Sequence, residues 1–198
     1  VLHGAMLAGI PNVLNLGSSC MYPRNATNPL KEEMVLAGEL EPTNEGYAIA
    51  KVAAARLCQY ISQQSPDLAY KTAIPCNLYG RYDHFEARRS HMIPAVIDKL
   101  HKAKQNQSHQ VDIWGDGLSR REFMYAQDLA DFVFYAMNNF SAMPTMLNIG
   151  LGKDVLINDY YKVIAEAVGY KGGFTHDLSK PSGMRQKLVD TSKLQDFG

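Results

Sequence analysis

A tyrosine and a lysine one helical turn apart are the residues of this sequence best suited to chemistry. Tyr47 and Lys51 are four positions apart in a run of strong helix formers, which places both side chains on one helical face. A lone phenol is a poor proton carrier at neutral pH, but a fixed ammonium group beside it stabilises the phenolate. The pair therefore suits protonation of a carbonyl group under reduction, or deprotonation of an alcohol under oxidation. The same spacing also fits a half-buried tyrosine beside a solvated lysine.

Polar residues follow two predicted strands. The apolar segment 13–16 leads directly into Ser18, Ser19 and Cys20, and the second predicted strand, 69–74, leads into Asn77. In open α/β sheets, ligands bind at the carboxyl ends of parallel strands. We therefore expect one crevice at this edge of a parallel sheet, formed by Ser18, Tyr47, Lys51 and Asn77.

The bulk properties exclude several classes of function. The chain has 198 residues, with 20 basic and 20 acidic side chains, so no net charge favours nucleic acid or a membrane surface. No apolar run approaches the roughly 18 residues needed to span a bilayer. Three cysteines are too few and too odd in number for a disulfide framework. We expect a soluble protein of the reducing cytoplasm with no metal site.

Alternating helices and strands predict an α/β fold. Helices are expected over 1–8, 47–63, 92–104, 129–138 and 159–168, and strands over 13–16, 69–74, 111–114, 121–125, 145–150 and 174–177. We expect strand 121–125 to pair with 111–114, Asp128 to cap the helix that follows it, Gly169 to end the last helix, and 24–43 to be a surface loop.

A dinucleotide-binding sheet needs a glycine-rich loop between its first strand and helix, and this sequence contains no Gly-x-x-Gly-x-x-Gly segment. We therefore expect the chain to form the C-terminal part of a doubly wound Rossmann-type parallel sheet with a smaller α/β substrate-binding domain. The N-terminal cofactor-binding strands are expected to be absent.

A strand-end serine followed by Tyr-x-x-x-Lys on the next long helix resembles the extended short-chain dehydrogenase/reductase superfamily. The sequence is most similar to the GDP-L-fucose synthase family within it. Six motifs carry this second resemblance in order along nearly the whole chain: Gly17-Ser18-Ser19-Cys20-Met21-Tyr22-Pro23, Glu41-Pro42-Thr43-Asn44-Glu45, Asn77-Leu78-Tyr79-Gly80, Ser90-His91-Met92-Ile93-Pro94, Trp114-Gly115 and Arg121-Glu122-Phe123.

The resemblance implies a two-domain organisation. Residues 1–79, with 122–150 returning to them, would form a partial NAD(P)-binding domain, and 80–121 with 151–198 would bind substrate. It also implies NADP(H) as cofactor, a GDP-sugar as substrate and a homodimer formed through the helix that bears Tyr47.

The resemblance further assigns catalytic roles. Ser18 would hold the substrate carbonyl, Tyr47 would transfer the proton, and Lys51 would bind the nicotinamide ribose. Cys20 would act as the base and His91 as the acid of an epimerisation, because a thiol and an imidazole titrate on either side of neutrality. The residues alone also fit a serine that caps backbone, an inert buried cysteine and a surface histidine.

Binding residues follow from the same resemblance. The cofactor contacts would be Leu16, Gly17, Ser18, Ser19, Lys51, Pro75, Cys76, Asn77, Leu78 and His91, and the substrate contacts Lys99, Trp114, Arg121, Ser182 and Lys187. Three positions depart from the family pattern: Cys76 replaces a threonine, Lys99 an arginine and Ser182 an aspartate. A lysine offers a phosphate a point charge where arginine offers two parallel hydrogen bonds.

Three functional hypotheses result. The first is a bifunctional enzyme that epimerises GDP-4-keto-6-deoxy-D-mannose and reduces it with NADPH to GDP-L-fucose. The second is a related activity on another GDP-keto-deoxysugar, such as GDP-L-colitose synthesis, with the same residues. The third is a non-catalytic fragment or paralogue that acts as a binding module, and the complete Ser18, Cys20, Tyr47, Lys51 and His91 set argues against it.

Overall fold

The chain divides into two compact units. The computed structural model describes residues 1–86, 90–180 and 183–198. The first unit comprises 1–78, 122–153 and 187–198, and the second comprises 79–121 and 154–186.

A three-stranded parallel sheet forms the centre of the first unit. Its strands are β1 (Asn12–Leu16), β2 (Ala69–Pro75) and β7 (Met146–Ile149), in the order β1-β2-β7. Both pairings are parallel, with Leu16 opposite Ala73 and Ile74 opposite Asn148. The central strand β2 is buried along most of its length, as expected where helices cover both faces of a sheet. The expected parallel α/β sheet is confirmed.

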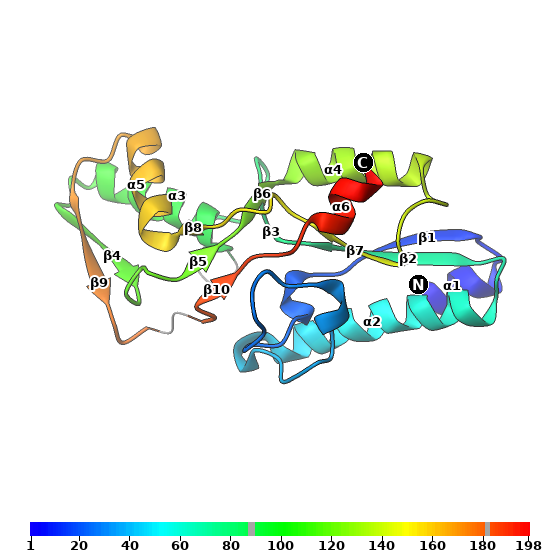
Figure 1. The fold of residues 1–198 in the computed structure, drawn as a ribbon. Helices are drawn as coiled ribbons and strands as arrows, with labels where there is room; N and C mark the ends of the chain where they lie inside the picture. The colour runs from blue at the N-terminus through cyan, green and yellow to red at the C-terminus, as the bar shows by residue number, and fades with distance from the viewer. Residues whose placement is uncertain (87–89, 181–182) are drawn as a thin grey trace. The chain divides into compact units, whose positions relative to one another are not determined.

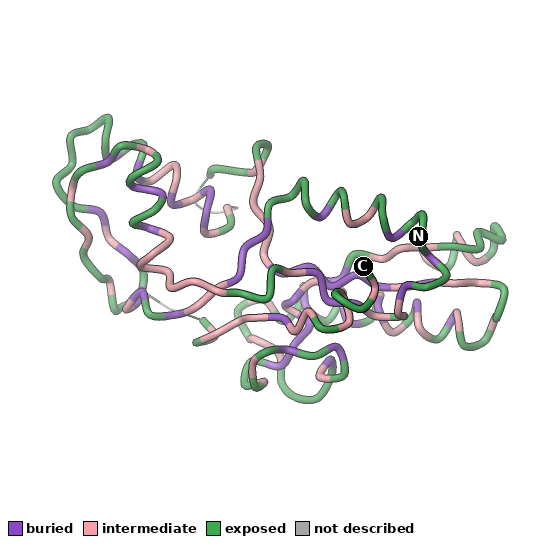
Figure 2. Tube along the Cα trace, turned by 45° about the horizontal axis from the view of Figure 1, so that its top comes forward, coloured by how far each residue is buried: buried purple, intermediate pink, exposed green. Residues whose placement is uncertain are grey.

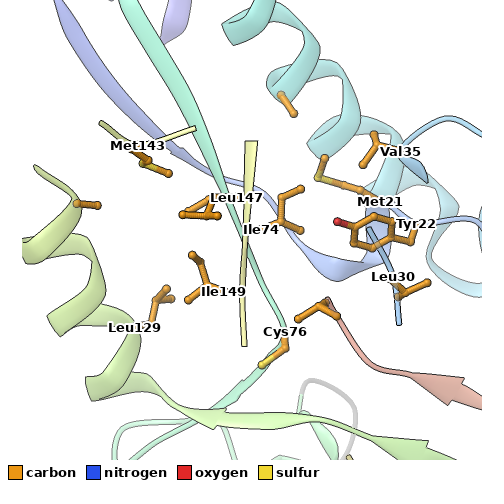
Figure 3. Packing of buried hydrophobic residues seen from close by; sticks show 14 of the residues in the cluster. Met21, Tyr22, Leu30, Val35, Ile74, Cys76, Leu129, Met143, Leu147 and Ile149 are labelled. Atoms are coloured by element: carbon orange, nitrogen blue, oxygen red, sulfur yellow. The ribbon is translucent and has the colours of Figure 1, made fainter. Parts of the chain in front are cut away.

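Helices cover both faces of this sheet (Figure 1). The long helix α2 (Glu45–Gln64) packs on one face beside α1 (Leu2–Leu7), and α4 (Ala126–Asn138) and α6 (Ser192–Phe197) lie on the other. In Figure 3, Leu147 and Ile149 point toward Leu129 of α4, whereas Ile74 points toward Met21 on the opposite face. Each such fully buried side chain stabilises the fold by about 1.5–3 kcal/mol.

The segment between β1 and α2 is less exposed than expected for a surface loop. It contains three short 3-10 helices, η1 (Ser19–Met21), η2 (Glu32–Met34) and η3 (Pro42–Asn44). Leu30 is completely buried and exchanges backbone hydrogen bonds with Leu188 and Asp190, each at 2.8 Å. Most of 24–43 is exposed, as expected of a surface loop, but Leu30, Glu32 and Val35 are buried, and Leu30 and Val35 belong to the core.

The second unit combines a strand pair and a short three-stranded sheet with two helices. Strand β4 (Gln110–Trp114) pairs in parallel with β9 (Gly173–Asp177), and α3 (Met92–Gln105) packs against α5 (Ile157–Val168). Strand β5 (Arg120–Arg121) pairs antiparallel with β8 (Val155–Leu156) and lies next to β10 (Gln186–Lys187). Helix α5 ends at Gly169, whose φ of 75° is left-handed, as the sequence predicts.

Two local predictions are wrong. Strand 111–114 does not pair with 121–125: its partner is β9, and β6 (Phe123–Tyr125) pairs with β3 (Asn77–Tyr79). Met124 belongs to the core of the first unit, so the apolar segment 123–125 is drawn away from β4. Asp128 does not cap α4, because the helix begins earlier, at Ala126, and Asp128 lies within its first turn.

The last twelve residues differ from the expected division. We placed all of 151–198 in a substrate-binding part, but 187–198 belong to the first unit. Val189 is buried in its core, and Leu194 and Phe197 of α6 pack against the same core.

The pattern of buried and exposed residues follows the helices. Figure 2 shows the helical segments changing between buried and exposed residues along each turn, which is the pattern of amphipathic helices that cover a sheet. Within the part of the chain that the structure describes, no helix combines the length and apolarity needed to cross a membrane.

Candidate active site

Helix α2 brings Lys51 to the end of β1. The Lys51 ammonium donates a hydrogen bond to the Leu16 carbonyl at 2.8 Å and lies 5.6 Å from the centroid of the Tyr47 ring. Tyr47 itself is 52% exposed, so its phenol is open to a ligand. The ammonium group therefore links the phenol to the carboxyl end of a parallel strand. An ammonium carries three N–H donors, and Leu16 uses one of them.

Ser18 has a backbone partner. Its Oγ accepts a hydrogen bond from the Cys20 amide at 3.2 Å and so caps η1. This is the backbone-capping role that the sequence left open. A hydroxyl that accepts from an N–H group keeps its own O–H donor, so Ser18 remains able to donate to a ligand oxygen.

Gly17 allows the chain between β1 and this serine to pack closely against its neighbours. Its amide donates to the Ala73 carbonyl at 2.7 Å. A Cβ atom at this position would lie 3.0 Å from Met21 Sδ, 3.1 Å from Thr72 Cγ2 and 3.3 Å from the Ala73 carbonyl oxygen. Any larger residue would displace the segment that carries Ser18 and Cys20.

Two N–H donors converge on the Cys20 sulfur. The Asn44 side-chain amide donates to Sγ at 3.1 Å and the Lys187 ammonium at 3.3 Å. All three residues belong to the first unit. The sulfur is thereby held as a hydrogen-bond acceptor between two donor groups. The resemblance suggested Lys187 as a substrate contact, whereas here its ammonium lies on the thiol.

The second strand end is formed by buried and half-buried residues. Ser19, Pro75 and Cys76 are buried, and Asn77 and Leu78 are partly exposed. Burial, and then the charge of Glu122, raises the pKa of the Cys76 thiol far above its ordinary range, so this thiol stays protonated. Because β1 and β2 are parallel neighbours, the residues after them share one edge of the sheet.

Glu122 is a site residue that sequence reasoning recognised only as part of a motif. Its side chain is fully buried, and its carboxylate accepts from the amides of Leu151 at 2.5 Å, Gly152 at 2.8 Å and Val189 at 3.1 Å. Its carbonyl accepts from the Asn77 side chain at 2.9 Å. Glu122 thus fixes the loop after β7, the segment before α6 and Asn77. The apolar residues that follow it directly were the available signal of an inward-facing carboxylate.

The second unit carries the other predicted residues. His91 is exposed at the N-terminus of α3, where its side chain makes no capping bond. Lys99 lies 2.8 Å from the Asp112 carboxylate and donates to the Asp112 carbonyl at 2.6 Å. The hydrogen bond from Lys99 holds the pKa of Asp112 below its ordinary value. Lys99 therefore already has an anionic partner.

Trp114 and Arg121 also lie in the second unit. Trp114 is 56% exposed, and the Lys180 ammonium lies 5.7 Å from its ring centroid. Arg121 donates to the Arg120 carbonyl at 2.8 Å, and its own carbonyl accepts from the Tyr160 hydroxyl at 3.1 Å. Ser182, together with Arg88 and Arg89 of the charged segment before His91, lies outside the described residues.

The arrangement in the first unit offers acid–base groups and hydrogen-bond donors. Over residues 1–86, 90–180 and 183–198, no group of three or more His, Cys, Asp or Glu side chains is placed to hold a metal ion. The ligand that this site suits has a carbonyl or hydroxyl group for Ser18 and Tyr47 and an acidic hydrogen for Cys20.

Comparison with known proteins agrees with this description. The chain is 59% identical to GDP-L-colitose synthase of Yersinia pseudotuberculosis and 46% identical to GDP-L-fucose synthase of Azorhizobium caulinodans, each over 198 residues. All of the chain is matched, against 64% and 63% of those proteins, so it spans somewhat less than two thirds of their length.

A solved structure of similar fold is a GDP-mannoheptose C4 reductase from Campylobacter jejuni with NADP bound. Its TM-score is 0.86 at 30% identity, and the match covers 100% of this chain and 67% of that one. Residues 1–150 match the NAD dependent epimerase/dehydratase family. With its parallel sheet, its Tyr47–Lys51 pair and this match over most of its length, the chain belongs to the NAD dependent epimerase/dehydratase family.

Proposed function

We propose that the protein epimerises and reduces a GDP-linked 4-keto-deoxysugar with NADPH. The observation that carries this proposal is the Lys51 ammonium, which joins the exposed Tyr47 phenol to the Leu16 carbonyl at the carboxyl end of β1. The chain's relatives, named as enzymes that form GDP-L-colitose and GDP-L-fucose, support the choice of a GDP-sugar.

The residues at this edge fit the nicotinamide end of NADP(H). Lys51 has N–H donors left for ribose hydroxyls, and segments 16–19 and 75–78 offer backbone groups beside it. Bound NADPH supplies the hydride for reduction of the ketone. Tyr47 gives its proton to the ketone oxygen, and the Ser18 hydroxyl donates a hydrogen bond to that oxygen and fixes its position.

Epimerisation is assigned to Cys20 and His91. A ketone acidifies the hydrogens on its neighbouring carbons, so inversion needs one group that removes a proton and another that returns one on the opposite face. Cys20, with its sulfur held as an acceptor by Asn44 and Lys187, removes the proton. His91 returns it. Trp114, Arg121, Lys99 and Ser182 are proposed to bind the nucleotide and the diphosphate.

Two keto-sugars compete as substrate, the precursors of GDP-L-fucose and of GDP-L-colitose. GDP-L-fucose has a hydroxyl on carbon 3, whereas colitose is the 3-deoxy sugar, so an enzyme that forms GDP-L-colitose has no stereocentre to invert there. The chain is 59% identical to the colitose enzyme and 46% identical to the fucose enzyme, and this is the reason to propose the 3-deoxy keto-sugar as a second candidate substrate. Incubation with each keto-sugar and NADPH, with NMR of the product, decides between them.

The proposed division of labour is tested by two variants of the full-length protein. Cys20→Ser replaces a thiol with a far weaker base, so it should lose exchange of carbon-bound hydrogen with deuterated solvent while NADPH affinity is unchanged. Tyr47→Phe should exchange deuterium without consuming NADPH. Proton NMR of the keto-sugar and the absorbance of NADPH are followed on both variants.

Loss of both reactions in both variants, with fold and cofactor affinity intact, would contradict separate roles for Cys20 and Tyr47. Absence of both reactions in the unmodified protein would leave a non-catalytic binding module as the better description.

The proposal extends to assembly and location. One face of α2 exposes Ile49, Leu57 and Tyr60 at helical spacing, away from the Tyr47–Lys51 face, which supports a homodimer formed through this helix. Cys20, Cys58 and Cys76 are all unpaired, which fits the reducing cytoplasm.

A further inference from the structure

The side chain of Asn44 does not make the helix-capping hydrogen bond expected at its position. It is the N-cap residue of α2, where an asparagine side chain ordinarily accepts from the first backbone amides of the helix and stabilises it by about 1 kcal/mol. In this structure its side chain makes no capping hydrogen bond. Instead, the amide nitrogen donates to Cys20 Sγ at 3.1 Å, 24 positions earlier in the chain.

A second stabilising interaction is also missing. The carbonyl oxygen Oδ1 of Asn44 is buried and, within the described residues, has no hydrogen-bond partner. Leaving a buried acceptor unpaired costs roughly 1–3 kcal/mol. An asparagine with a purely structural role would use this oxygen for the helix cap. The retained contact with Cys20 is therefore the feature of Asn44 that needs an explanation.

The sulfur is the acceptor in this contact. Lys187 reaches the same Sγ atom at 3.3 Å, and an ammonium group can only donate. Two donors on one sulfur fix the direction in which it can accept, and so fix its position in the site. Asn44 also ties this sulfur to the first turn of α2, the helix that carries Tyr47 three residues later.

We propose that Asn44 is a positioning residue for Cys20, which holds the sulfur as a hydrogen-bond acceptor at a fixed place relative to Tyr47. The role of this sulfur as a base rests on the proposed function, whereas its hydrogen bonding to Asn44 does not. Removal of Asn44 should leave the sulfur with one donor fewer and a less defined position, with the fold retained.

The test compares Asn44→Ser with the parent protein in full-length form. Serine is a good N-cap residue, so the variant should keep or gain helix stability. Iodoacetamide alkylation of Cys20 is followed by peptide mass spectrometry across a range of pH, which separates it from the buried Cys58 and Cys76. In Asn44→Ser the alkylation rate should fall by about threefold or more at every pH in this range. A fall in rate is diagnostic, because the smaller side chain would widen reagent access and so raise the rate.

Thr43→Ala is the matched control. Thr43 precedes Asn44 in η3, and its hydroxyl donates to Glu41 at 3.3 Å. Its alkylation profile should coincide with that of the parent. An Asn44→Ser profile that also coincides with the parent would overturn the proposal. If Asn44→Ser also melts at a lower temperature than the parent, Asn44→Ala is measured as well. A change in alkylation rate that Asn44→Ala does not share would then be an effect of the introduced serine and would overturn the proposal.

Substrate chemistry gives a separate readout. If Cys20 is the base, Asn44→Ser should slow solvent deuterium exchange of the keto-sugar by about tenfold while NADPH affinity is unchanged. Exchange at the parent rate, despite slower alkylation, would overturn the mechanistic part. If the parent shows no exchange at all, the proposed function fails, and the alkylation profiles alone decide the role of Asn44.

Discussion

Each reactive side chain after β1 has a protein partner that leaves part of its hydrogen-bonding capacity for a ligand. Ser18 accepts from a backbone amide and keeps its O–H donor, and Lys51 uses one donor on Leu16. The Cys20 sulfur accepts from Asn44 and Lys187. These contacts fix the direction of each group before a ligand arrives, which lowers the cost of binding in a reactive geometry.

Tyr47→Phe is expected to lower NADPH consumption by about 100-fold or more, because the residue that protonates the ketone oxygen is lost. Stability should change little, since Tyr47 is exposed. Tyr60→Phe is the matched control, as Tyr60 is an exposed tyrosine on the same helix. NADPH absorbance with the keto-sugar measures both. A Tyr47→Phe rate within about tenfold of the parent would remove Tyr47 from proton transfer.

Glu122→Gln is expected to lower the free energy of unfolding by about 1–3 kcal/mol. The glutamine amide nitrogen would face one of three backbone N–H donors that the buried carboxylate now accepts. Urea unfolding measures the change. Glu39→Gln removes an exposed carboxylate paired with Arg24 at 2.5 Å and should cost less than about 1 kcal/mol. Equal effects of the two substitutions would contradict the role given to Glu122.

At the scale of residues, the sequence predicted which residues belong to the candidate site better than it predicted their hydrogen-bond partners. The motifs named Ser18, Cys20, Tyr47 and Lys51, and their catalytic roles remain predictions. The links from Asn44 and Lys187 to Cys20 join residues 24 and 167 positions apart, so no local pattern contains them. They depend on how distant segments pack.

At the scale of elements, the first turn of a helix and its C-terminal end use glycine differently. Gly46 lies in the first turn of α2 with open space around its Cα, whereas Gly169 ends α5 with a φ of 75°. Gly46→Ala is expected to stabilise the protein by about 0.5 kcal/mol, and Gly169→Ala to destabilise it by about 1 kcal/mol. Thermal unfolding of the two variants measures these shifts. A change of the same sign in both would contradict the assignment.

Helix α6 is attached to η2 by ion pairs. The Lys193 ammonium contacts Glu33 and lies 3.2 Å from the Glu32 carboxylate. Burial lowers the pKa of Lys193, but its hydrogen bonds to Glu33 and Glu32 outweigh burial and raise that pKa above its ordinary value. The hydrogen bond from Lys193 lowers the pKa of the exposed Glu33 below 4.5.

Lys193→Met is therefore expected to cost about 1–3 kcal/mol at neutral pH, because it leaves the buried Glu32 carboxylate without its cation. At pH values between the pKa of Glu33 in the folded state and its pKa in the unfolded state, Glu33 binds fewer protons in the folded state. Its contribution is thus present above pH 4.5 and lost as pH falls through the folded pKa.

Urea unfolding at neutral and acid pH measures the difference in unfolding free energy between the parent and Lys193→Met. This difference should become smaller below pH 4.5. Lys162→Met is the control, since Lys162 pairs with Asp159 at an exposed site. A difference that widens in acid would contradict this account.

The helices and most strands followed from their periodicity, which is local. The partners of the strands did not, because β4 pairs with a strand about sixty positions later and adjacent segments were the wrong choice. The start of α4 was misplaced because Asp128 suits both a cap and a first turn.

At the scale of the whole molecule, the proposed dimer depends on one face of α2. Leu57→Glu places a charge among the exposed apolar residues Ile49 and Tyr60 and should convert the proposed dimer to monomer. Sedimentation velocity measures the change, with circular dichroism to show that the fold is kept. Leu178→Glu alters an exposed leucine of the second unit and should leave the assembly unchanged. A parent protein that sediments as a monomer would contradict the dimer.

The sequence also predicted that the chain returns to the first unit after residue 121. It did not predict the second return at residue 187, because a short helix such as α6 carries little pattern of its own. The evidence for that return is a core position, Val189, whose amide is held by Glu122.

This second return bears on the order in which the chain is made. Residues 1–78 are synthesised before the second unit, but their core includes Leu129 and Leu147, and Val189 more than a hundred positions later. The second unit, by contrast, consists of 79–121 and 154–186, so all its residues have been made before residue 187. During synthesis the first unit therefore keeps apolar surface uncovered until Val189 has been made, after the second unit is complete. Its exposure to chaperones and proteases lasts longer than that of the second unit, although most of its residues are made earlier.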